Sequence, residues 1–173
     1  AFNKPQSFYE ALQLTYFIQL VLQIESNGHS QSLGRLDQYL YPFYANDKKQ
    51  GLIDDDFVME LLENTWLKLV SMKKIRSWSH TRFSAGGPLY QNVTIGGILQ
   101  DGSDAVNELS YLILKSVGET KLTQPNLTVR FHENLSTDFL LECIKVIQLG
   151  FGMPAFNNDS IVIPSFHKLG VEE

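Results

Sequence analysis

The residues between positions 25 and 30 form the densest group of potentially functional side chains in the sequence. This group, Glu25-Ser26-Asn27-Gly28-His29-Ser30, directly follows a strongly apolar segment. An imidazole and a hydroxyl can each donate and accept hydrogen bonds, so His29 and Ser30 are suited to binding a small hydroxylated molecule. Polar loops that follow buried elements often carry binding residues. The alternative is that both side chains only satisfy backbone groups of the loop, and spacing alone leaves both interpretations open.

The sequence lacks the motifs of several common enzyme classes. It has no phosphate-binding Gly-Lys-Ser/Thr loop, no Gly-x-Gly-x-x-Gly after a strand and no Gly-x-Ser-x-Gly elbow. Cys143 lies among apolar residues of a predicted helix, where a thiol acts as a small hydrophobic group. We therefore expect no metal site and no kinase, hydrolase or dehydrogenase machinery. The histidines, none at metal-site spacing, are His29, His80, His132 and His167.

Polar residues also adjoin the predicted strands. Gln124-Pro125-Asn126 and the run from Met153 to Asp159 each lie beside one of them. In parallel α/β proteins the carboxyl ends of the strands usually carry the chemistry, so we expect functional polar groups at that end. Arg35 and Asp37 are interpreted as structural residues that pair with each other or with nearby backbone.

Composition narrows the class of protein. The 173 residues are 43% hydrophobic and 19% charged, as in a soluble globular domain with its own core. The net charge of -5 and the lack of a basic stripe argue against nucleic acid or an anionic membrane as a partner. The apolar stretch Leu12–Ile24 is too short to span a bilayer and no signal peptide precedes it. A single cysteine fits a reducing, cytoplasmic compartment.

The elements that position these residues alternate between helix and strand. A capping box of Ser7 and Glu10 predicts a first helix to about Ile24, apolar on most sides and therefore buried. Further helices are predicted at about 42–50, 54–75, 105–122, 136–149 and 161–169, the third of these capped by Ser103 or Asp104. Strands are predicted at 90–95, 126–131 and 155–156, and 27–34 is predicted to be a loop. This order indicates an α/β fold with a mostly parallel sheet.

Six segments occur in an order shared with a known family: Glu25–Ser30, Gly34–Pro42, Gln91–Gly97, Asp104–Tyr111, Gln124–Asn126 and Gly152–Asp159. Together they resemble the pyruvate formate-lyase-like family of glycyl radical enzymes, in particular its formate acetyltransferase-like branch related to glycerol dehydratase. The resemblance covers nearly the whole chain. Any one segment is unspecific, whereas six in this order are highly specific.

The resemblance implies that residues 1–173 are a half-barrel fragment of a ten-stranded α/β barrel with several long helices. In this family a cysteine on a central loop becomes a thiyl radical, and a glycine near the far C-terminus stores the radical. A radical S-adenosylmethionine activating enzyme generates that glycyl radical. The cysteine motif, Gly-Cys-Ile/Val-Glu, follows shortly after a stretch like Phe166–Glu173. We therefore expect both radical residues outside this chain, and no turnover from the chain alone.

The resemblance also implies substrate contacts. In the dehydratase branch a His-Ser pair contacts substrate hydroxyls, which implies substrate-binding roles for His29 and Ser30. That branch has an aromatic residue before the proline of its glycine-rich loop, where this chain has Gly87 before Pro88. The missing ring enlarges the pocket and argues against glycerol itself as substrate. We expect Tyr90 to form part of that wall.

Three functions stay open at this point. The preferred one is a section of a radical lyase or dehydratase of anaerobic metabolism that acts on a small hydroxylated compound. The second is a section of a formate C-acetyltransferase, which uses two adjacent cysteines. The third is a non-catalytic structural module. For the enzyme we expect a small-molecule substrate, an activating enzyme and a homo-oligomer.

Overall fold

The centre of the molecule is a parallel β-sheet. The computed structural model describes residues 3–26, 30–72, 77–84 and 89–171. Within these residues the sheet has four parallel strands in the order β1-β2-β3-β4. The α/β class and the parallel sheet predicted from the sequence are therefore confirmed. The strands are β1 (Ser32–Arg35), β2 (Asn92–Gly96), β3 (Asn126–Phe131) and β4 (Ala155–Asn158).

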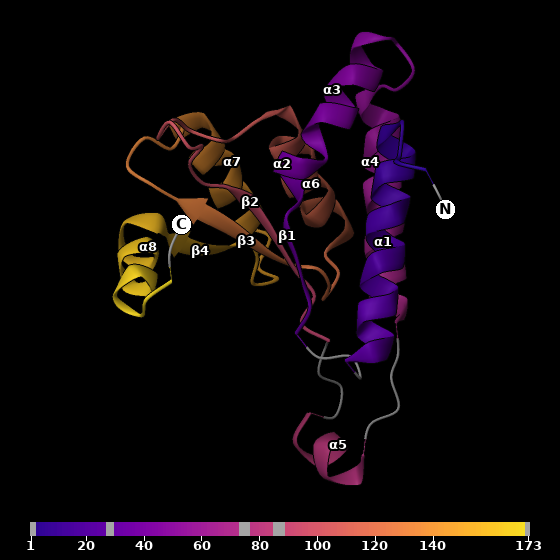
Figure 1. The fold of residues 1–173 in the computed structure, drawn as a ribbon, viewed down its shortest axis with the longest axis vertical. Helices are drawn as coiled ribbons and strands as arrows, with labels where there is room; N and C mark the ends of the chain where they lie inside the picture. Colours follow the sequence, from indigo (N-terminus) through magenta and orange to yellow (C-terminus); the bar gives the residue numbers. More distant parts are fainter. Residues whose placement is uncertain (1–2, 27–29, 73–76, 85–88, 172–173) are drawn as a thin grey trace.

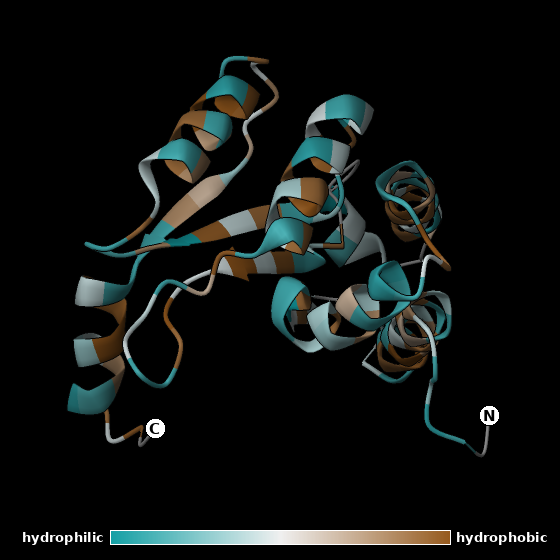
Figure 2. Ribbon diagram, turned by 90° about the horizontal axis from the view of Figure 1, so that it is seen from above, coloured by the Kyte–Doolittle hydropathy of each residue, from teal (hydrophilic) through white to brown (hydrophobic). Residues whose placement is uncertain are grey.

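Helices connect and flank the strands. Figure 1 shows the amino ends of β1 and β2 close to the C-terminal ends of the two long helices α1 and α4. Figure 2 shows α6 and α7 over one face of the sheet. The helices are α1 (Phe8–Glu25), α2 (Leu36–Tyr39), α3 (Tyr41–Lys49), α4 (Asp55–Ser71), α5 (Trp78–Ser84), α6 (Glu108–Thr120), α7 (Thr137–Ile147) and α8 (Asp159–Lys168).

The hydrophobic core lies between the sheet and its helices. Trp66 of α4 is fully buried, and its indole Nε1 donates a 2.8 Å hydrogen bond to Oγ of Ser116 in α6. This bond satisfies the one polar group of the ring and joins the two helices. The other core side chains are mainly aliphatic and come from α1, α2, α3, α4, α6 and α7 and from the strands β2 and β3.

The helix caps are partly those expected. The Ser7 hydroxyl accepts from the Glu10 amide at 3.2 Å, but the Glu10 carboxylate accepts from the Gln6 amide, so only half of the predicted capping box forms. The predicted cap of the third long helix is wrong, because α6 is capped by Asn107. Asp104 instead accepts from the amide of Ser136, at the start of α7.

The sequence prediction missed three short elements. β1 lies in the segment predicted to be a loop, and α2 and α5 were not expected. β1 and α2 have only four residues each, too few to produce a clear hydrophobic period. The helix predicted to reach Ile75 ends at Ser71, and residues 73–76 lie outside the described residues.

The prediction that the first helix is buried is wrong for this chain. Its buried residues include Phe8, Leu12 and Gln19, but the outer face of the helix is apolar and exposed. The exposed apolar residues of α1 are Tyr9, Phe17, Ile18, Val21, Leu22 and Ile24.

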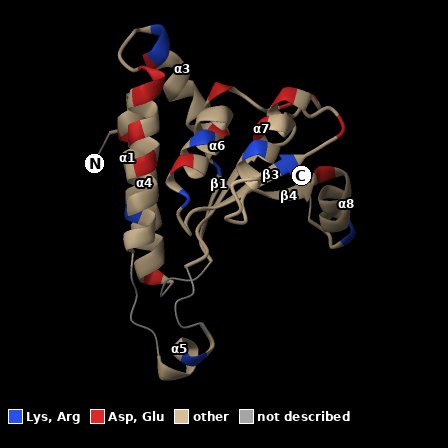
Figure 3. Ribbon diagram, turned by 180° about the vertical axis from the view of Figure 1, so that it is seen from behind, with Lys and Arg blue, Asp and Glu red and all other residues tan. Residues whose placement is uncertain are grey.

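Over the helices of the described chain, basic and acidic residues are interspersed, as Figure 3 shows.

We expect the isolated 173-residue chain to self-associate at micromolar concentration. All four residues of the edge strand β4 are exposed, and an open strand edge can pair with another chain. The apolar outer face of α1 is a second surface through which chains can associate. Sedimentation velocity should therefore detect dimers or larger species. Val21→Lys, which places a charge within this face, should shift the distribution toward monomer. A compact monomer at every concentration would contradict the expectation.

Candidate functional site

Ser30 and Tyr90 lie side by side at the amino ends of β1 and β2. The strands pair in parallel with Ser32 opposite Asn92, and each candidate residue lies two positions before that pair. The Ser30 amide donates a 2.9 Å hydrogen bond to the Leu89 carbonyl, directly before Tyr90. The structure thus brings together two candidate residues that are 60 positions apart in the sequence.

Both residues have backbone conformations that side chains rarely adopt. Ser30 and Tyr90 each have φ of 55°, in the left-handed region. Such conformations persist only where the surroundings hold them, and they cluster at binding and catalytic sites. Strained backbone at two neighbouring strand ends therefore marks this place as a candidate site.

The two side chains are available to a ligand. Ser30 is exposed, and 56% of the Tyr90 surface is accessible. Within the described part of the chain, neither hydroxyl has a hydrogen-bond partner. Each can donate one hydrogen bond and accept others, so the pair can bind a hydroxylated molecule. The tyrosine ring can also provide an apolar wall.

A set of buried amide side chains lies behind these two residues. Gln91, next to Tyr90, is fully buried, and so nearly are Gln19 and Gln124. The main-chain amide of Gln91 donates a hydrogen bond to the side-chain Oε1 of Gln124 at 2.7 Å. The side-chain Nε2 of Gln19 lies 3.4 Å from Oε1 of Gln91. The sequence analysis did not single out Gln19 or Gln23. Their spacing of four places both on one helix face, which is the signal that was available.

His29, Gly87 and Pro88 lie outside the described residues. Ser30 and Tyr90 precede their strands, so this pair does not lie at the carboxyl ends, where functional groups are expected. Gln124 also precedes its strand, β3.

The carboxyl ends of the strands are occupied by internal contacts. The Arg35 guanidinium donates to the carbonyls of Gly96, at 2.8 and 3.1 Å, and Ile98. Arg130 forms an ion pair of 2.8 Å with the buried Asp159. Burial, together with the nearby Arg130, lowers the pKa of Arg35. These contacts support the structural role predicted for Arg35 and explain why this end is the poorer candidate.

Asp37 is structural as predicted, although it bonds to β2 and α6 and not to Arg35. Its carboxylate accepts from the Gly96 amide at 2.8 Å and from the Ser110 hydroxyl at 2.6 Å. Burial raises the pKa of this carboxyl group. Asp37 therefore holds the end of β2 against the start of α6.

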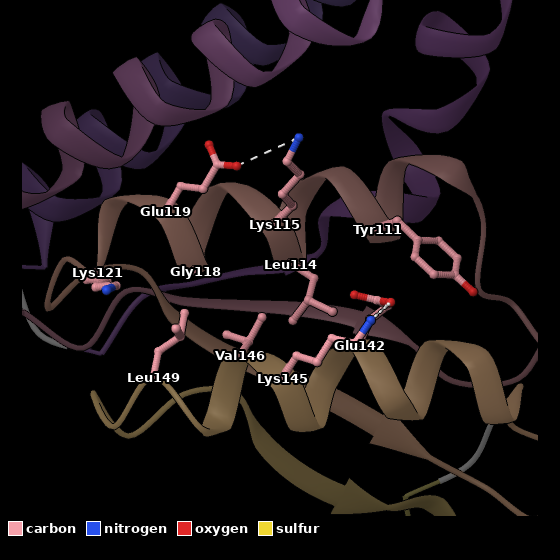
Figure 4. A pocket seen from close by; sticks show the side chains of 10 residues that line it. All are labelled: Tyr111, Leu114, Lys115, Gly118, Glu119, Lys121, Glu142, Lys145, Val146 and Leu149. Atoms are coloured by element: carbon pink, nitrogen blue, oxygen red, sulfur yellow. Dashed lines mark hydrogen bonds and ion pairs between the residues drawn. The ribbon is translucent and has the colours of Figure 1, made fainter.

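A groove of about 570 Å³ lies between α6 and α7 (Figure 4). Leu114, Val146 and Leu149 lie along it, while Lys115 pairs with Glu119 on its own helix. Neither Ser30 nor Tyr90 lines this groove. Apolar and charged side chains line the groove, and neither candidate residue reaches it, so we do not assign the substrate site to it.

Cys143 lies in the core, as predicted. Its side chain is fully buried in α7, and burial raises the pKa of the thiol to about 12. A protonated, enclosed thiol is inert. In the described part of the chain, no group of three or more His, Cys, Asp and Glu side chains could hold a metal ion. Likewise, no helix in the described residues is long and apolar enough to cross a membrane.

Comparison with known proteins gives matches along the whole chain. A family model described as "Pyruvate formate lyase-like" matches residues 1–173. The probable dehydratase YbiW of Escherichia coli is 61% identical over 176 residues, covering 99% of this chain and 22% of that protein. The (2S)-3-sulfopropanediol dehydratase of Klebsiella oxytoca is 36% identical over 168 residues, covering 96% of this chain and 20% of that protein.

A solved structure also matches the fold. It is the glycerol-bound form of the B12-independent glycerol dehydratase from Clostridium butyricum, with a TM-score of 0.91 and 42% sequence identity. The match covers 98% of this chain and 21% of that one. The chain therefore spans about a fifth of the length of these relatives.

Proposed function

Because the chain belongs to the pyruvate formate lyase-like family of glycyl radical enzymes, we propose that it is one section of a dehydratase for a small hydroxylated substrate. The site of binding is the amino ends of β1 and β2. Ser30 contacts a substrate hydroxyl, and Tyr90 forms part of the pocket wall. His29, which directly precedes Ser30 in the sequence, is proposed as a further substrate-binding residue.

One observation carries this proposal. Ser30 and Tyr90, whose hydroxyls are accessible and have no partners in the described chain, lie on neighbouring strand ends with strained backbone. A substrate with two or more hydroxyl groups can pair with both, which would fix its orientation. Glycerol and sulfopropanediol, in the names of two relatives, are molecules of this kind.

The radical chemistry of the proposal comes from outside this chain. A glycyl radical and its partner cysteine supply hydrogen-atom abstraction in the complete enzyme, and an activating enzyme generates the radical. Cys143 does not fit the role of that cysteine, because its thiol is fully buried in α7. The residues of this chain bind and orient the substrate. With no disulfide and one buried thiol, the enzyme is expected in the cytoplasm.

Dehydration is preferred to acyl transfer because the relatives described above are named as dehydratases. The test is to activate the complete enzyme anaerobically with its activating enzyme and to supply a set of vicinal diols. Glycerol, 1,2-propanediol and diols with longer chains form this set. We expect loss of one water from at least one diol to give the corresponding aldehyde, observed by NMR, with the longer diols preferred to glycerol.

The control is the same activated enzyme with pyruvate and coenzyme A. Formation of formate and acetyl coenzyme A, with no aldehyde from any diol, would contradict the proposal and support the acyltransferase alternative. A well-activated enzyme that converts neither substrate set would also contradict it.

A further inference from the structure

Gln91 is fully buried, and its hydrogen bonds link it to three other segments of the chain. Its main-chain amide donates to Gln124, and its carbonyl accepts from the amide of Asn126 at 2.9 Å. Its side-chain Nε2 donates to the Leu69 carbonyl of α4 at 2.9 Å. Its Oε1 lies 3.4 Å from Nε2 of Gln19 in α1. The residue directly after Tyr90 is therefore fixed from several directions.

The same contacts extend to Ser30. Nε2 of Gln19, besides facing Gln91, donates to the carbonyl of Gln31 at 3.2 Å. The Ser30 amide donates to the carbonyl of Leu89. The backbone of Ser30 is thus held by a hydrogen bond at its own amide, and the next residue, Gln31, by a hydrogen bond from Gln19. Both hydrogen bonds connect to the segment that contains Tyr90.

Stability alone gives little reason for a glutamine at this position. Burial of a carboxamide removes it from water, and its internal hydrogen bonds approximately compensate for that loss. A pair of apolar residues of the same shape can replace a buried hydrogen-bonded pair at little or no loss of stability. What leucine cannot provide is the pair of directed side-chain contacts, to the Leu69 carbonyl and to Gln19, beside the two residues with φ of 55°.

We propose that Gln91 is a positioning residue that sets the relative placement of Ser30 and Tyr90 in the substrate site. This inference rests on the proposed function for its kinetic consequence, but not for its structural one. Gln91 itself does not touch the substrate. It acts through the backbone of Tyr90 and, by way of Gln19, through the backbone next to Ser30.

The test compares Gln91→Leu with Ser116→Ala in the complete enzyme. Ser116 is a matched control because it is equally buried and accepts one side-chain hydrogen bond, from Trp66, away from the strand ends. Hydrogen exchange of the peptide that contains Ser30 is the first measurement. In Gln91→Leu the Ser30 amide should exchange about tenfold faster than in Ser116→Ala, because its bond to Leu89 is no longer held in place.

Kinetics with the preferred diol are the second measurement. A variant that only loses stability reduces the amount of active enzyme and leaves KM unchanged. Displacement of the binding groups should instead raise KM for Gln91→Leu about tenfold, with a smaller effect on kcat. If Gln91→Leu does not fold, Gln19→Leu serves as the second variant, because it removes the link to Gln31 and preserves the contacts of Gln91 with Leu69 and Gln124.

The outcomes separate the two claims. Faster exchange at Ser30 together with a raised KM supports positioning by Gln91. Exchange and KM equal to those of Ser116→Ala would overturn it, even in an active dehydratase. Faster exchange in an enzyme that dehydrates no diol would support the positioning role and overturn only the proposed function.

Discussion

Removal of the Ser30 hydroxyl is expected to lower kcat/KM of the complete enzyme for its hydroxylated substrate about ten- to a hundredfold. A hydrogen bond between a protein hydroxyl and a substrate hydroxyl contributes about 1–3 kcal/mol when its loss leaves a buried group unpaired. Each ~1.4 kcal/mol corresponds to a factor of ten in rate. Ser30→Ala tests this in steady-state assays of the activated enzyme.

Two control variants separate the hydroxyl from the backbone. Ser30→Gly also removes the hydroxyl, but glycine adopts the φ of 55° without strain. Both variants should lose activity to a similar extent if the hydroxyl is what matters. Ser165→Ala on α8, which loses only a bond to its own helix, should retain full activity. If Ser30→Ala keeps activity within twofold of the unmutated enzyme, Ser30 has no substrate-binding role.

Replacement of Asp37 by alanine is expected to lower the free energy of unfolding of this chain by about 2–4 kcal/mol. The change leaves the Gly96 amide and the Ser110 hydroxyl buried without their shared acceptor. Chemical denaturation at low protein concentration measures the effect. Ser103→Ala, at an exposed position, is the control and should change stability little. A loss below about 0.5 kcal/mol for Asp37→Ala would contradict the assigned role.

Asp37 should also give the chain a characteristic pH dependence. Burial raises the pKa of the folded carboxyl group above its unfolded value, so the folded state binds the proton more tightly. This contribution to stability is complete below the ordinary pKa of aspartate and is lost as pH rises through the raised pKa. Asp37→Asn cannot titrate. The stability of the parent chain relative to Asp37→Asn should therefore fall with rising pH across that window, and a relative stability that grows with pH would contradict it.

The elements with strong local signals could be predicted from the sequence. The Ser7 cap located the start of α1, and the helix predicted from residue 54 begins at Asp55. β3 matches its predicted bounds because polar and apolar residues alternate along it. The cap of α6 was misplaced because Asp104 makes a tertiary contact with Ser136, which no local pattern reveals.

Only part of the candidate site could be predicted from the sequence. The polar cluster after the first helix singled out Ser30, and the family resemblance added Tyr90. Their proximity depends on the register of β1 and β2, whose residues are far apart in sequence. The amides behind them were missed for the same reason, since Gln19, Gln91 and Gln124 meet only after α1, β2 and β3 are packed. Their glutamine identity carries no local structural signal.

The most direct test of the account is a structure of the complete enzyme with its preferred diol bound. We predict a substrate hydroxyl at hydrogen-bond distance, about 3 Å, from Oγ of Ser30, with Tyr90 lining the same pocket. The strand ends should keep the φ values of Ser30 and Tyr90 and the contacts of Gln91. A diol bound elsewhere, with Ser30 touching only protein, would contradict the assignment of the substrate site to the amino ends of β1 and β2.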